Sequence, residues 1–165
     1  MGDDEESKTA NTDYACAGER HYEDASYLHG DGRLLNADHL FGLAVECLMK
    51  ALLLRFGGSH RVSMTDRRNR PAKLPWWDNP ATGDREPLRH IDEMCSALPL
   101  LLEGRSGPAL NRALTRVAAD FEKWVVDDRY TDGAHLPPAL LSRRQEAATL
   151  AQELHLHVQF TGKLP

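Results

Sequence analysis

The 165-residue chain has only three cysteines, Cys16, Cys47 and Cys95, and they are widely spaced. No two of them form a Cys-x-x-Cys pair, so the sequence indicates neither a disulfide framework nor a zinc knuckle. A reducing compartment fits this cysteine usage best. A single domain of this length hides roughly 70% of the surface that its unfolded chain exposes, which allows a genuine core without covalent links.

The sequence also lacks the features of an exported or membrane-spanning protein. It begins Met-Gly-Asp-Asp-Glu-Glu, the opposite of a basic signal-peptide start, and no uninterrupted apolar run reaches the roughly 18 residues that cross a bilayer. We therefore expect a cytoplasmic protein. Residues 1–12 are acidic and polar with no apolar periodicity, so we expect a disordered tail ahead of one domain over residues 13–162.

A third absence is a positive charge balance. The chain has 20 Lys and Arg against 25 Asp and Glu, a formal net charge of −5. Non-specific affinity for nucleic acid depends on cations that neutralise phosphates, so any such contact must be local. One local candidate exists, because residues 59–73 contain five cations and a single acid, Asp66, and two tryptophans follow directly.

Two interpretations of this basic segment remain open. Arginines beside paired aromatic rings are typical of sites that hold an RNA backbone and stack its bases. The other interpretation is a solvated loop whose tryptophans fold back onto the body of the protein. The candidate RNA-binding residues are Arg67, Arg68, Arg70, Lys73, Trp76 and Trp77.

Motifs for cofactors and metals are missing as well. The chain has no Gly-rich phosphate loop, no His-Glu-x-x-His helix and no nucleophile elbow. His155 and His157 are two residues apart, which places them on nearly opposite sides of a helix and disfavours a shared metal. We expect neither a cofactor nor a metal.

The pattern that is present is helical. Apolar and small residues recur at spacings of three and four over residues 14–28, and residues 34–56 are apolar around most of a helix, with Gly57-Gly58 as a stop. Such an all-round apolar helix belongs in the middle of a bundle. Prolines and polar residues over 58–87 predict a long irregular basic loop, and a short helix is predicted over 88–98.

Two more helices are predicted after that loop. The first begins at Pro108 and ends near Arg129, on the amphipathic stripe formed by Leu110, Leu114, Val117, Phe121, Trp124 and Val125. The second starts at Pro137-Pro138 and runs toward Gly162. Because no alternating strand pattern is visible, we predict an all-α protein, an antiparallel bundle of four or five helices.

Three segments carry a family resemblance. Residues 19–25 (Glu-Arg-His-Tyr-Glu-Asp-Ala) and residues 36–53, which include Asp38-His39-Leu40-Phe41-Gly42, resemble the first two helices of HEPN proteins. Residues 124–130 (Trp-Val-Val-Asp-Asp-Arg-Tyr) resemble a later segment of the HEPN sequences. The resemblance implies an antiparallel helical bundle that is commonly dimeric. It also implies, for many members, a metal-independent ribonuclease site built from an Arg followed four to six residues later by a His.

The sequence contains that spacing once in the corresponding region, as Arg129 and His135 with five residues between them. Cleavage of RNA through its 2′-hydroxyl needs proton transfer and stabilisation of a phosphorane. The imidazole of His titrates near neutral pH, and Arg presents a permanent planar cation to phosphate oxygens. We therefore expect His135 to act as acid or base and Arg129 as phosphate clamp, with Tyr130 and Asp132 in supporting roles. The resemblance implies that a homodimer supplies a second copy of each.

A second group of polar residues lies on the central helix. His39, Glu46 and Lys50 differ by seven and four positions, so they fall within about 40° of one another on a helix that is otherwise apolar. One interpretation is a polar wall of the functional cleft in which Glu46 orients Arg129 or His135. The other is an ordinary Glu-to-Lys pair on a solvent-facing strip.

Two functional hypotheses follow. The first is a metal-independent endoribonuclease of the toxin or phage-defence kind, which rests on the family resemblance. The second is a non-catalytic HEPN module that binds nucleotide or a protein partner, such as a minimal nucleotidyltransferase that acts as antitoxin. Loss of RNA cleavage on substitution of Arg129 and His135 is expected under the first hypothesis only.

Overall fold

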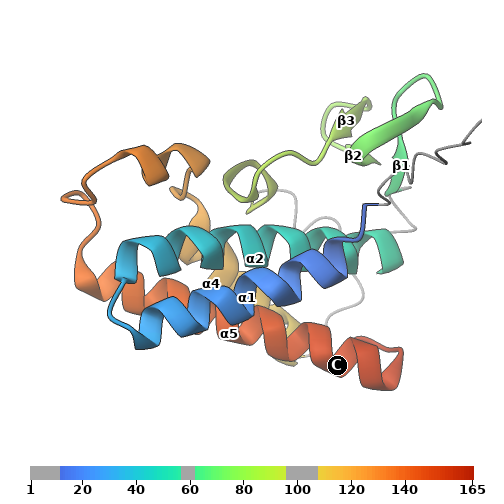
Figure 1. The fold of residues 1–165 in the computed structure, drawn as a ribbon. Coiled ribbons are helices and arrows are strands. Elements are labelled where there is room, and N and C mark those ends of the chain that lie inside the picture. The colour runs from blue at the N-terminus through green and yellow to red at the C-terminus, as the bar shows by residue number, and fades with distance from the viewer. Residues whose placement is uncertain (1–11, 57–61, 96–107) are drawn as a thin grey trace, which may run out of the picture.

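The computed structural model describes residues 12–56, 62–95 and 108–165 of the chain. The expected disordered tail over 1–12 lies outside these ranges except for its last residue, and so does the Gly57-Gly58 stop. Within the described ranges, four long helices form a bundle and a small sheet lies at one end of it (Figure 1). The sheet makes the predicted all-α class too narrow: the protein is mostly helical with a three-stranded antiparallel sheet.

The first two helices form an antiparallel hairpin. Helix α1 (Tyr14–Gly30) starts where the Asp13 carboxylate accepts a hydrogen bond from the backbone N–H of Cys16 at 3.0 Å. A turn at Asp31 and Gly32, with φ of +75° at the glycine, leads into helix α2 (Leu34–Phe56). Helix α2 is buried along most of its length, which confirms that it is the central helix.

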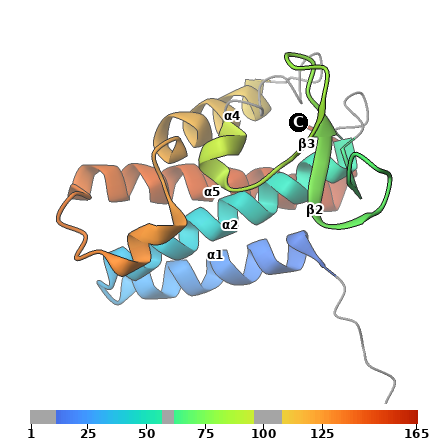
Figure 2. The same cartoon turned by 90° about the horizontal axis from the view of Figure 1, so that it is seen from above.

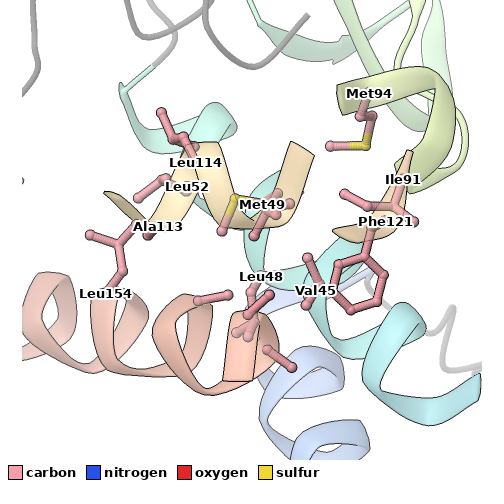
Figure 3. Packing of buried hydrophobic residues seen from close by; sticks show 14 of the residues in the cluster. Val45, Leu48, Met49, Leu52, Ile91, Met94, Ala113, Leu114, Phe121 and Leu154 are labelled. Atoms are coloured by element: carbon pink, nitrogen blue, oxygen red, sulfur yellow. The ribbon is translucent and has the colours of Figure 1, made fainter. Parts of the chain in front are cut away.

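The remaining long helices cover the other side of α2. Helix α4 (Pro108–Phe121) packs on helix α5 (Pro138–Thr161), and α5 packs on α2 (Figure 2). Figure 3 shows apolar side chains of α2 meeting those of α4, α5 and residues 91–95 in one core. Helix α5 starts with a proline in its first turn and ends at Gly162 with φ of +72°, as the sequence predicted.

Of the segment predicted as an irregular loop over 58–87, residues 58–61 lie outside the described ranges, and residues 62–87 contain the three strands of the sheet. Strands β1 (Ser63–Thr65), β2 (Pro71–Asp78) and β3 (Arg85–Pro87) pair in the order β1-β2-β3. Two prolines in the central strand masked its alternating pattern, because proline contributes no ladder N–H and usually argues against a strand. The three-residue partners of β2 are too short to show a period of their own.

Two helix predictions also need correction. Helix α4 stops at Phe121, and Arg129 belongs to a separate 3₁₀ helix, η2 (Val126–Tyr130). Trp124 continues the apolar stripe in the sequence and is fully buried, but it does not belong to the helix. Its side chain reaches the core from a turn in which the Trp124 N–H donates to the carbonyl of Phe121 at 3.0 Å. Of the helix predicted over 88–98, residues 91–95 are helical and 96–98 lie outside the described ranges.

Gly42 on α2 gives Trp124 its place in the core. A Cβ atom built on Gly42 would lie 2.0 Å from Cε2 of that indole ring, far inside van der Waals contact. We expect Gly42→Ala to lower the free energy of unfolding by about 1–3 kcal/mol, the usual cost of overpacking. Urea unfolding checks this, with Gly30→Ala as the control because nothing lies within 4 Å of a Cβ there. Equal midpoints for the two variants would contradict the contact.

Candidate functional site

The loop that follows η2 is held in a defined shape by short-range hydrogen bonds. The Thr131 hydroxyl donates to the carbonyl of Asp128 at 2.8 Å, and the backbone N–H of Ala134 donates to the Asp132 carboxylate at 3.0 Å. Gly133 has φ of +74° and lies against the side chain of Leu35, where a Cβ atom would clash at 2.5 Å. These contacts turn the chain back on itself and bring His135 over η2.

His135 forms a hydrogen bond with Asp128, the residue that precedes Arg129. The His135 Nε2 lies 3.1 Å from Asp128 Oδ1, and the carboxylate is 12% exposed whereas the imidazole is half exposed. An ionised carboxylate only accepts hydrogen bonds, so Nε2 is the nitrogen that carries the proton. Nδ1 is then the nitrogen available for proton exchange with another molecule, since no described residue bonds to it.

Arg129 and Asp128 line a pocket of about 330 Å³ between η2, the end of α1 and the start of α2. The Arg129 guanidinium carbon lies 4.7 Å from the centroid of the exposed Tyr130 ring. Arg129 makes no ion pair with any residue that the structure describes. The pocket therefore presents a guanidinium with no described ion-pair partner, and Asp128, which lines the same pocket, connects it to the His135 imidazole.

His39 lines the same pocket from α2. Its ring is stacked on Trp124, with centroids 5.7 Å apart and planes inclined by 24°. Burial, followed by the positive charge of Arg129, holds the pKa of His39 below its ordinary value, and the Asp128 carboxylate offsets only part of this. His39 is therefore an uncharged imidazole beside a permanent cation at neutral pH.

The contribution of Arg129 to the titration of His39 is testable. Removing the cation in Arg129→Ala is expected to raise the pKa of His39, because a nearby positive charge disfavours protonation of the ring. Titration of the imidazole signals by NMR measures this shift. His157, an exposed residue on α5, is the internal reference for the measurement. An unchanged His39 titration would show that the guanidinium does not face the ring.

The prediction that Glu46 orients Arg129 or His135 is wrong. Glu46 is 8% exposed, and its two oxygens lie 2.6 Å from Lys50 Nζ and 3.1 Å from His90 Nδ1. Glu46 is seven residues beyond His39, about 10 Å farther along α2, where residues 88–95 cover the helix. The alternative of an ordinary Glu46–Lys50 pair is confirmed as a pair, but its predicted solvent-facing position is wrong, because Lys50 is only 4% exposed. His39 is the member of this stripe that reaches the Arg129 pocket.

The residues predicted to bind RNA separate into three groups. Lys73 and Trp76 line a second pocket, of about 520 Å³, next to Lys50 and His90. Arg67, Arg68 and Arg70 are exposed in the turn between β1 and β2, where Arg70 binds Asp66 through two hydrogen bonds of 2.8 and 2.9 Å. Trp77 is only 5% exposed and packs in the core, so it offers no face for base stacking and leaves the predicted set.

Sequence reasoning missed two partners that the fold supplies. Asp128 was not singled out, although an acid directly before Arg129 was a visible signal. His90 was not predicted to belong to a site with Glu46, because the two residues are 44 positions apart in the sequence. A pairing over that distance in sequence leaves no local pattern.

No family model matches this sequence, and comparisons with curated proteins and with solved structures find no match. In the described ranges, no cluster of three or more His, Cys, Asp and Glu side chains is arranged to hold a metal ion. Among the same residues, no helix is both long and apolar enough to span a bilayer. The HEPN resemblance therefore stays an expectation from residues 19–25, 36–53 and 124–130.

Proposed function

We propose that the protein is a metal-independent endoribonuclease, active as a homodimer, with Arg129 and His135 as its catalytic residues. One observation carries the proposal: the Asp128–His135 hydrogen bond joins the imidazole to the pocket in which Arg129 has no described ion-pair partner. Metal independence, the dimer and a role in toxin or phage-defence systems come from the HEPN resemblance alone.

The proposed reaction is internal transesterification of RNA. An imidazole removes the proton from a 2′-hydroxyl, the 2′-oxygen attacks the adjacent phosphorus, and the bond to the 5′-oxygen breaks as that oxygen receives a proton. In the proposed dimer, one His135 accepts the first proton and the partner copy donates the second. The products are a 2′,3′-cyclic phosphate and a free 5′-hydroxyl, so atoms and charge balance without a co-reactant.

The other residues of the site have defined tasks in this proposal. Arg129 binds the non-bridging phosphate oxygens, where negative charge accumulates in the phosphorane. Asp128 fixes the ring of His135 through its hydrogen bond to Nε2. His39, uncharged beside Arg129, is a supporting residue that hydrogen-bonds the substrate at the pocket wall. Asp132 supports the site through the backbone of the loop.

The proposal is tested by incubating the purified protein with total RNA in excess chelator. We expect cleavage that is undiminished by the chelator, together with growth inhibition when the protein is expressed. Intact RNA over a wide range of enzyme concentration, with and without added divalent cations, would contradict an endoribonuclease and favour the non-catalytic hypothesis.

A further inference from the structure

The larger of the two pockets described above is lined by Lys50 of α2 and by residues of β2, whereas the Arg129 pocket is lined by residues at the start of α2. We call it the sheet pocket. It measures about 520 Å³, within the size range of pockets that enclose small organic ligands. It shares no lining residue with the Arg129 pocket, so it is a separate site.

A polar cluster of the buried Glu46 and Lys50 and the half-exposed His90 forms the floor of the sheet pocket. Lys50 lines it, and its ammonium group gives one of three N–H donors to Glu46 at 2.6 Å. The second Glu46 oxygen binds His90 Nδ1 at 3.1 Å, which fixes the imidazole ring and leaves Nε2 without a described partner. Glu46 thus presents two nitrogen groups of the pocket wall, Lys50 Nζ and His90 Nε2, in fixed positions.

The exposed rim adds two more cations, Lys73 and Arg89. Two acids also line the pocket, Asp66 and Glu93. Asp66 is already bound by Arg70 and by backbone N–H groups, and these hydrogen bonds, the backbone one from Arg70 first, lower its pKa to about 2. The rim therefore retains a positive balance that favours an anion.

The other walls are apolar and flat. Pro71, Leu74 and Pro87 line the pocket together with Trp76 of β2. Tyr14 secures this wall to α1, because its hydroxyl donates to the carbonyl of Lys73 at 3.2 Å. An aromatic ring beside cations is the combination that stacks a planar base and holds the phosphate attached to it.

We propose that the sheet pocket binds a phosphorylated nucleoside, with the base against Trp76 and the phosphate between Lys73, Arg89 and His90. The ligand has two sources, a free nucleotide or one residue of an RNA chain. Lys50 follows His39 by eleven positions on α2, which places both on nearly the same face and about 16 Å apart along the axis. The proposal does not rest on the ribonuclease proposal, because binding needs neither Arg129 nor His135.

The test is calorimetric titration of the full chain with nucleoside monophosphates, the matching nucleosides, inorganic phosphate and a short oligoribonucleotide. The His135→Ala background prevents any cleavage from disturbing the measurement. The test variant is Lys73→Ala with Arg89→Ala, and the charge-matched control is Arg33→Ala with Lys163→Ala, two exposed cations that line neither pocket. Trp76→Phe retains an aromatic face and Trp76→Leu removes it.

The nucleoside monophosphate should bind about tenfold or more weakly to the test variant and unchanged to the control, since two charged contacts are lost. Trp76→Leu should weaken binding and Trp76→Phe restore most of it. Binding of the oligoribonucleotide alone, with the same loss in the test variant, identifies RNA as the source. The proposal would be overturned if neither the nucleoside monophosphate nor the oligoribonucleotide binds, or if inorganic phosphate binds as tightly as the nucleoside monophosphate. Equal affinity of the test and control variants for the nucleoside monophosphate would also overturn it.

Discussion

Replacing His135 with alanine is expected to lower the rate of RNA cleavage by about 100- to 10,000-fold, the usual contribution of a positioned acid or base. The imidazole is held by Asp128 at 3.1 Å and half exposed, so its removal takes away the proton-transfer group without opening the core. Arg129→Ala should cost a similar factor through loss of charge stabilisation, and Arg129→Lys should recover part of it, since lysine keeps the charge but not the planar fork.

The matched control for this loss is His157→Ala. His157 is an exposed histidine on α5 and lies in neither the Arg129 pocket nor the sheet pocket. Rates are measured on a defined oligoribonucleotide in chelator, and circular dichroism confirms that each variant is folded. Cleavage by His135→Ala at the rate of His157→Ala would refute the assignment of His135 whatever the outcome for Arg129.

Removing Asp38 is expected to lower the free energy of unfolding by about 3–5 kcal/mol, because it leaves a buried guanidinium without its counter-charge. Asp38 Oδ2 lies 2.8 Å from Arg144 Nη1, and the two side chains are 3% and 1% exposed. Arg144 also donates to the backbone carbonyl of Asp120 at 2.9 Å. The pair thus joins α2, α4 and α5, and Asp38→Ala disturbs all three helices.

Urea unfolding of three variants separates burial from simple loss of an ion pair. Arg143→Ala removes a 53% exposed arginine from the buried Asp120 carboxylate, which keeps Arg116 Nε at 3.3 Å, and should cost about 1 kcal/mol or less. Asp38→Leu combined with Arg144→Leu removes both charges and should be more stable than Asp38→Ala alone. Equal unfolding midpoints for Asp38→Ala and Arg143→Ala would show that the inner pair is solvated.

The helices could be predicted because their signals are local. The proline start and glycine end of α5 and the apolar circumference of α2 are each readable within one turn or one helix. The sheet could not, because β2 carries two prolines and its pairing with β1 and β3 depends on residues that show no period alone. The end of the helix that begins at Pro108 was predicted too late for another reason. An apolar residue that is buried from a turn, such as Trp124, cannot be told in the sequence from one that is buried from a helix.

The same distinction applies to the candidate sites. Arg129 and His135 could be proposed from the sequence because their spacing is a feature of the chain itself. The pair of Glu46 with Lys50 could be predicted because it lies within one helix. Its second partner, His90, could not, because helical periodicity places residues on a face but does not say which distant segment covers each turn. Residues 88–95 cover α2 at Glu46, whereas η2 covers it near His39. Only the fold divides that polar stripe between two pockets.

Analysis of the RNA ends produced in excess chelator tests the central claim most directly. Proton removal from the 2′-hydroxyl by one imidazole and proton donation to the 5′-oxygen by the other, at a phosphate held by Arg129, predict fragments with 2′,3′-cyclic phosphate and 5′-hydroxyl termini, detectable by mass spectrometry of a defined oligoribonucleotide. Fragments that carry 5′-phosphate and 3′-hydroxyl termini would require attack by water in place of the 2′-oxygen, and would contradict the roles given to Arg129 and His135.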